Sequence, residues 1–123
     1  MVDGKDLVRK LYILDSVNGE VREDMFTEAA KELGVKLKID MDRYRRSRNL
    51  PENYDFYFLH LSDVDIASVD HINREQPWSY LVGISGGYFH GRGEDGELFD
   101  KKLSALIIYD SYVRLLKEML ESE

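Results

Sequence analysis

The sequence predicts a three-layer α/β domain: a five-stranded, mostly parallel sheet with helices on both faces. Apolar runs of strand length alternate along the chain with segments of helical periodicity, which is the pattern of such a domain. The main runs stay apolar at successive positions, as expected of strands that are covered on both faces. A length of 123 residues suits one domain with one core. We therefore expect a single domain over residues 1–123.

The first half of the chain supplies a strand, a helix and an edge strand. Segment 7–14 is continuously apolar from Leu11 on, which predicts a buried strand. Segment 21–34 has helical periodicity and ends at Gly34, a common helix stop. Segment 35–39 alternates apolar and basic residues, as an edge strand with one solvated face does. The apolar stripe of the helix consists of Val21, Met25, Phe26, Ala29, Ala30 and Leu33.

The central part continues the alternation of strand and helix. The polar run 41–49 fits either a helix or a loop. Segment 54–61 has the aromatic and aliphatic density of a central strand, and 64–75 fits a short helix that Pro77 ends. Segment 78–85 predicts the next buried strand.

The C-terminal part allows three interpretations. We prefer a short helix near 96–103, a strand over 105–109 and a final helix from Asp110. Asp is a favourable N-cap, and β-branched isoleucines favour a strand. In the second interpretation, 98–123 is one long helix. In the third, 98–102 is the fifth strand and a helix follows it.

Polar or small residues follow each predicted strand. Parallel strands joined by right-handed crossovers place all their carboxyl ends at one edge of the sheet, where such sheets bind ligands. Asp and Ser at these positions also cap helices, which is the simpler explanation for each residue taken alone. The residues expected at this edge are Asp15, Ser16, Ser62, Asp63, Asp65, Ser85, Gly86, Gly87, Asp110 and Ser111.

In the order of these elements and in the spacing from Asp15 to Asp63, most of the chain resembles the receiver domain of two-component response regulators, a flavodoxin-like fold. The resemblance implies acidic residues after the first strand that hold Mg²⁺ and an Asp after the third that accepts a phosphoryl group. It also implies a Ser or Thr after the fourth strand that senses the phosphoryl group, and a Lys after the fifth that contacts it. Carried over by position, the resemblance implies that Asp15 is the acid that holds the metal ion, Asp63 is the phosphoryl acceptor and Ser85 is the sensing hydroxyl.

The chain departs from that family at two positions. Leu14 stands where the family has part of an acidic pair, and Asp110 follows the predicted fifth strand where the family has Lys. The first change lowers Mg²⁺ affinity, and the second puts a like charge beside a phosphoryl group. We therefore predict a degenerate receiver-like regulatory or protein-interaction module that is neither phosphorylated nor an enzyme. It should have no resident metal or cofactor, and a vestigial pocket at Asp15, Asp63 and Ser85.

Two alternatives stay open. A working receiver would be phosphorylated at Asp63. Lys101 or Lys102 would supply its cation if the fifth strand lay at 98–102. A small phosphate-handling or Mg²⁺-dependent enzyme would use Asp63 and Asp65 with the glycine-rich segment that follows the fourth strand.

The glycine-rich segment can place backbone N–H groups around an anion, with a mobile turn as the alternative. Its candidate anion-binding residues are Gly86, Gly87, His90 and Arg92. The three histidines are dispersed at His60, His71 and His90, and the chain has no cysteine, so no zinc site is expected.

Four arginines crowd a short stretch of an otherwise acidic chain and predict a surface for a protein partner. They are Arg43, Arg45, Arg46 and Arg48. Guanidinium groups pair with carboxylates and phosphates, although a solvated charged segment is the alternative. The net charge of -7 argues against nucleic acid as that partner.

The final helix carries more apolar residues than one sheet face needs, which predicts a homodimer or another partner contact. Its two rows are Val113, Leu116 and Leu120, and Tyr112, Leu115 and Met119. No apolar run approaches the roughly 18 residues of a membrane span, and the amino terminus lacks the apolar core of a signal peptide. We therefore expect a cytoplasmic protein without membrane contact.

Overall fold

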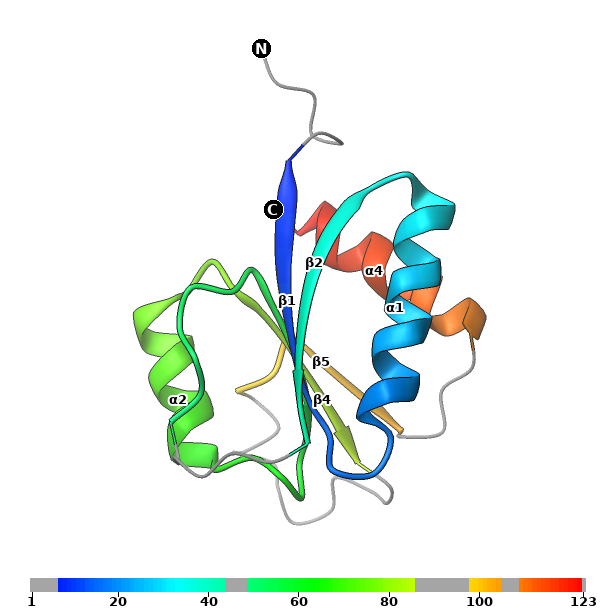
Figure 1. Cartoon of the computed structure of the whole chain (residues 1–123). Helices are drawn as coiled ribbons and strands as arrows, with labels where there is room; N and C mark the ends of the chain where they lie inside the picture. The colour runs from blue at the N-terminus through cyan, green and yellow to red at the C-terminus, as the bar shows by residue number, and fades with distance from the viewer. Residues whose placement is uncertain (1–6, 44–48, 86–97, 105–108, 123) are drawn as a thin grey trace.

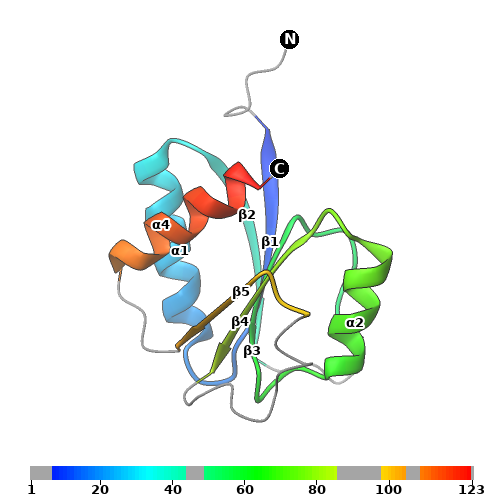
Figure 2. The ribbon, with the colours of Figure 1, turned by 180° about the vertical axis from the view of Figure 1, so that it is seen from behind.

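The computed structural model describes residues 7–43, 49–85, 98–104 and 109–122. Five strands form one sheet in the order β2-β1-β3-β4-β5, and every neighbouring pair is parallel. Helices α1 and α4 cover one face and α2 covers the other (Figure 1), as the view from behind in Figure 2 also shows. The strands are β1 (Val8–Leu14), β2 (Lys36–Asp42), β3 (Phe56–His60), β4 (Tyr80–Ser85) and β5 (Lys101–Ser104), and the helices are α1 (Gly19–Leu33), α2 (Ile66–Glu75) and α4 (Tyr109–Glu121). The predicted three-layer α/β class is confirmed.

Two apolar cores lie on opposite faces of the sheet, and the alternation of side chains along the strands creates both. Leu11 and Ile13 of β1 pack toward α1 and α4, whereas Tyr12 and Leu14 pack toward α2. On the first face, the Phe26 ring lies 5.1 Å between centroids from the rings of both Phe58 and Tyr112. The central strands are therefore buried on both faces, as their continuous apolar runs predicted.

Helix α1 ends where the sequence predicted. Gly34 adopts a left-handed conformation with φ 68°, and its N–H bonds back to the Lys31 carbonyl. The predicted apolar stripe is correct at Phe26, Ala29 and Ala30, which are buried. It is wrong at Val21, whose side chain is half exposed. The helix is rotated so that Arg22, and not Val21, faces the sheet.

The fifth strand lies earlier than we predicted. The short helix near 96–103 is wrong, because residues 101–104 form β5 beside β4. The strand over 105–109 is wrong at Tyr109, where α4 begins, and residues 105–108 lie outside the described residues. The third interpretation, with its fifth strand at 98–102, overlaps β5.

Contacts with β4 explain this placement. The Asp100 N–H donates to the Leu81 carbonyl, and the Asp100 carboxylate accepts the Leu81 N–H, both at 2.8 Å. Phe99 packs so closely over Gly83 that an added Cβ there would lie 3.0 Å from the ring. Pairing with a distant strand thus overrides the local helical pattern.

Both apolar rows of α4 are used inside the domain. Tyr112, Leu115, Leu116 and Met119 are buried in the first core, and partly buried Val113 and Leu120 pack against it. The surplus apolar surface that suggested a homodimer is therefore not present on this helix. Dimerisation itself stays a prediction.

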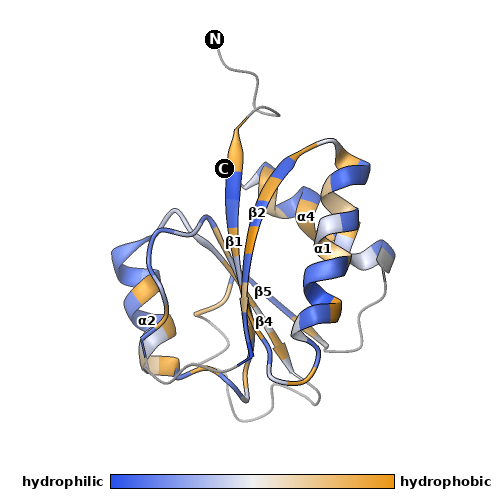
Figure 3. Cartoon of the chain, viewed as in Figure 1, coloured by the Kyte–Doolittle hydropathy of each residue, from blue (hydrophilic) through white to orange (hydrophobic). Residues whose placement is uncertain are grey.

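Strand β2 forms one edge of the sheet and keeps the alternation that its sequence predicted. Leu37, Ile39 and Met41 pack against the first core, whereas Lys36 and Lys38 are exposed. The same alternation appears as orange and blue bands along β2 (Figure 3). Within the described residues, no helix is long and apolar enough to cross a membrane.

Candidate functional site

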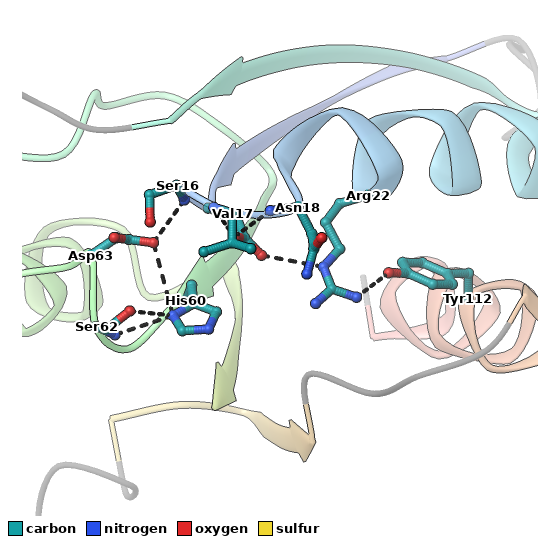
Figure 4. A network of polar contacts seen from close by, with 9 residues as sticks. Ser16, Val17, Asn18, Arg22, His60, Ser62, Asp63 and Tyr112 are labelled. Carbon is teal, nitrogen blue, oxygen red and sulfur yellow. Dashed lines mark hydrogen bonds and ion pairs between the residues drawn. The ribbon is translucent and has the colours of Figure 1, made fainter. Parts of the chain in front are cut away.

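The carboxyl ends of β1, β3 and β4 bring residues predicted at this edge of the sheet into neighbouring loops, and we call this edge the rim. Leu14 pairs with Leu59, and His60 pairs with Ile84, so the three strands end side by side. The Ser16 N–H donates to the Asp63 Oδ2 at 2.8 Å and joins the loops after β1 and β3 (Figure 4). The predicted meeting of these strand ends at one rim is thus present for β1 and β3.

Asp15 is completely buried, and its carboxylate accepts hydrogen bonds from three donors. Oδ1 takes the N–H groups of Val17 and Asn18, each at 2.9 Å, and Oδ2 takes the Arg22 Nε–H at 3.2 Å. Burial alone would raise the pKa of Asp15, but these bonds, with a smaller contribution from His60, hold it below its ordinary value. The carboxylate is therefore kept ionised by groups of the protein itself.

Arg22 is the cation in this arrangement. Its exposed fraction is 3%, its Nε–H bonds to Asp15, and its Nη1–H donates to the Tyr112 hydroxyl at 2.7 Å. Figure 4 shows the guanidinium between the start of α1 and Tyr112. Burial raises the pKa of Tyr112, and Arg22 opposes this rise. The network connects the rim to α4.

Arg22 and Tyr112 were not predicted as members of a site. Arg22 lies one turn before buried Phe26, on the helix face toward the sheet. An arginine in register with an apolar stripe was the available signal, since a buried arginine requires a partner. Tyr112 was read only as an apolar residue.

His60 and Asp63 form the second part of the rim. His60 ends β3, and its Nδ1 lies 2.6 Å from the Ser62 Oγ and accepts the Ser62 N–H at 3.3 Å. The Asp63 Oδ2 lies 3.8 Å from the same nitrogen. The side chains of His60 and Asp63 are only 17% and 13% exposed. Asp63 thus lies in the turn beyond β3, whereas His60 occupies the strand end itself, a position we had read only as part of a strand.

No family model matches the sequence, and no curated protein matches it. Solved structures do match the fold. A response regulator from Thermotoga maritima superposes with a TM-score of 0.70 at 10% identity, over 94% of this chain and 99% of that one. A putative pilus assembly-related protein from Burkholderia pseudomallei K96243 gives 0.70 at 9% identity, over 99% and 94%. A CheY-like response regulator receiver domain from Methylobacillus flagellatus gives 0.59 at 20% identity, over 92% and 99%. The chain has the receiver fold.

The structure alters two of the assignments that we made from the resemblance to receiver domains. They concern Asp110 and the lysine expected at the fifth strand. Our prediction that Asp110 follows the fifth strand is wrong, because Asp110 lies inside α4. Lys101 starts β5 and pairs with Glu118 of α4 at 3.2 Å, and Ser104 ends the strand. The resemblance implied a lysine after the fifth strand, and residues 105–108 after Ser104 lie outside the described residues.

Mg²⁺, which the receiver fold implies, does not fit the residues at the rim. The Leu14 side chain supplies no oxygen and is buried in the second core. Asp15 already accepts three hydrogen bonds and faces a guanidinium. Asp65 caps α2 by accepting the Ala67 N–H at 3.0 Å. The part of the chain that the structure describes contains no group of three His, Asp or Glu residues arranged for a metal ion.

Other predicted site residues are only partly described. Ser85 ends β4, one residue beyond the pair of His60 and Ile84. Arg43 is exposed and forms an ion pair with Glu20. The predictions on the anion-binding loop and on the rest of the basic run lie outside the described residues; these residues are Gly86, Gly87, His90, Arg92, Arg45, Arg46 and Arg48.

Proposed function

We propose that this chain is a receiver-fold regulatory module that acts by contact with a protein partner, without phosphorylation of Asp63 and without enzymatic activity. The observation that carries the proposal is the buried ion pair between Asp15 and Arg22. In this pair the Arg22 guanidinium lies against the Asp15 carboxylate, where the resemblance implied a metal ion. A cytoplasmic location stays a prediction from the sequence.

The chemistry of phosphorylation gives the first reason. A carboxylate that attacks a phosphoryl group needs cations to offset the charge that accumulates. Freeing Asp15 to hold a metal would leave Arg22 buried without its carboxylate. Breaking a buried pair in this way costs about 3–5 kcal/mol. A divalent ion must offset that cost with few other carboxylates available, because the buried Leu14 side chain contributes no oxygen.

The surroundings of Asp63 give the second reason. Its Oδ2 already accepts the Ser16 N–H, and the side chain is 13% exposed. Among the described residues, β5 ends at Ser104, and Lys101 at its start is paired with Glu118 of α4. Asp63 therefore works as a link between two loops in this arrangement.

The test is incubation with Mg²⁺ and acetyl phosphate, followed by intact mass measurement. We expect no phosphorylated species. A gain of one phosphoryl group that disappears in the Asp63→Asn variant would overturn the proposal and favour a phosphorylatable receiver. A gain that persists in Asp63→Asn would place the modification at another residue and would leave the claim about Asp63 standing.

A second candidate function, a small phosphate-handling or Mg²⁺-dependent enzyme, has less support. It needs Asp63 and Asp65 as a pair of ligands, but the first bonds to Ser16 and the second caps α2. Its other component, the glycine-rich segment, stays a prediction. Hydrolysis of a generic phosphoester such as p-nitrophenyl phosphate that is lost in Asp63→Asn would favour this candidate.

A further inference from the structure

The end of the sheet opposite the rim has a two-stranded extension. Strand β1 pairs with β2 from Val8 onward but with β3 only from Leu11. Residues 8–10 and 36–38 therefore project beyond the rest of the sheet, as β1 and β2 do at the top of Figure 1. Helix α2 lies beside the lower part of the sheet in that view.

Three lysines share the face of this extension that is turned away from α1. Leu37 and Ile39 point toward the first core, so the alternate residues Lys36 and Lys38 point the other way. Lys10 is the register partner of Lys38 in β1, and neighbouring strands are about 4.8 Å apart. Lys10 lies on the same side, since its Nζ is 4.6 Å from the Tyr54 ring centroid. We call Lys10, Lys36 and Lys38 the lysine face.

The lysine face is not neutralised within the described residues, where none of its three members forms an ion pair. The two carboxylates beside it have other partners. The Asp55 Oδ2 accepts the Lys10 backbone N–H at 2.8 Å, and the Asp40 Oδ2 accepts the Tyr54 hydroxyl at 2.5 Å.

The bond between Tyr54 and Asp40 is not easily lost. Burial, together with Asp40, raises the pKa of Tyr54 to about 12, so the hydroxyl stays a donor at neutral pH.

Lysines directly opposite each other on neighbouring strands are destabilising. This chain places such a pair, with a third lysine beside it, on a protein whose net charge is -7. Val8, the register partner of Lys36, is 57% exposed. Within the described part of the chain, this surface thus combines ammonium groups that form no ion pair with an accessible apolar side chain.

We propose that the lysine face binds an acidic peptide segment of the partner. This inference rests on the proposed function, since it names the surface and the chemistry of the contact. Short carboxylate-rich peptides complement three close ammonium groups, and their apolar residues can cover Val8. A nucleic acid or an anionic membrane fits less well, because Asp40 lies two residues from Lys38 on the same face and the chain as a whole is acidic.

The test uses fluorescence anisotropy with a fluorescein-labelled oligoglutamate at low salt. The wild-type chain should bind it in a salt-dependent way. The Lys36→Glu, Lys38→Glu double variant should bind at least about tenfold more weakly. A matched control is Arg114→Glu, Lys117→Glu, which changes the net charge equally at exposed positions of α4, on the other face of the sheet. The control should change affinity by about twofold or less, as a distant charge does in salt.

Three outcomes would overturn the inference. The first is no binding of oligoglutamate by the wild-type chain. The second is an equal loss of affinity in the control variant, which would indicate attraction to the overall charge. The third is lysine-dependent binding of a single-stranded oligonucleotide or of phosphatidylserine vesicles where oligoglutamate does not bind.

A folding readout separates a lost surface from a lost fold. Lys38→Glu places opposite charges side by side with Lys10, so the melting temperature should rise while oligoglutamate affinity falls. A fall in both would mean that Lys38 acts in folding and would count against a binding role. Failure of this inference is distinguishable from failure of the proposed function, since the acetyl phosphate test depends on Asp63 at the opposite end of the sheet.

Discussion

The two ends of the sheet differ in whether their charged side chains have partners of opposite charge. At the rim, the Asp15 carboxylate is buried and bonded to Arg22, and Asp63 is bonded to Ser16. At the lysine face, Lys10 and Lys38 lie beside each other, and no described carboxylate pairs with them. We expect loss of either partner of the buried pair at the first end to destabilise the fold, and the adjacent lysines at the second end to destabilise it as they stand. Within the described residues, the lysine face thus lies at the end of the sheet opposite the edge where such sheets bind ligands.

Removing Arg22 should have the largest effect on stability. Arg22→Met leaves the Asp15 carboxylate buried without its cation, so the free energy of unfolding should fall by about 3–5 kcal/mol. Urea denaturation measures it. The control Arg74→Met removes an exposed pair with Asp70 and should cost about 0.3–0.5 kcal/mol. Similar losses for the two variants would mean that the rim pair is no more important than a surface pair.

Acid should weaken the rim through Asp15. Because its folded pKa lies below the ordinary value of 3.8, the unfolded chain takes up the proton first as pH falls. The stabilisation is fully present above that ordinary value and is lost as pH falls through the folded pKa. Denaturation of the wild type and of Asp15→Asn from pH 5 downward should give curves that converge in acid. Parallel curves over that range would show that the carboxylate charge does not matter.

Tyr112→Phe should have an intermediate effect. It removes a hydroxyl that accepts from buried Arg22 while preserving the ring packed against Phe26, so a loss of about 1–3 kcal/mol is expected. Tyr80→Phe is the control, because Tyr80 is only partly buried and its hydroxyl has no hydrogen bond within the described residues. If the Tyr112→Phe variant and the wild type were equally stable, the hydrogen bond between α4 and Arg22 would contribute nothing to stability.

The smallest effect should have the opposite sign. Lys38→Glu exchanges a like-charge pair for an opposite-charge pair and should raise the free energy of unfolding by about 0.2–1 kcal/mol. The same urea measurement detects it, and high salt should reduce the gain. A lower free energy of unfolding in Lys38→Glu would contradict the claim that the lysines at this end of the sheet destabilise the fold.

Local patterns were sufficient to predict most of the fold. Gly34 predicted the end of α1, and the runs at β3 and β4 predicted buried strands, because these signals come from neighbouring residues. The position of β5 depends on contacts of Phe99 and Asp100 with a distant strand, which periodicity does not encode.

The sequence was sufficient to predict where the rim lies in the fold, but not which side chains contact each other there. Asp15 and Asp63 were assigned from strand ends, and parallel topology does bring their loops together. Arg22 was missed because one arginine in an acidic, helical segment looks solvent-exposed until the rotation of α1 is known. That rotation is set by how Phe26 packs on Phe58 and Tyr112.

The central claim is that Arg22 serves as the counterion of Asp15 where the resemblance implied a metal ion. The most direct measurement is a Mg²⁺ titration of the wild-type chain followed by amide NMR, observing Ser16, Val17 and Asn18. The N–H groups of Val17 and Asn18 bond to the Asp15 carboxylate and would shift if it took up a metal ion. We predict no saturable shift of these amides at millimolar Mg²⁺, with or without beryllofluoride. Saturable shifts of Val17 and Asn18 that vanish in Asp15→Asn would contradict the account.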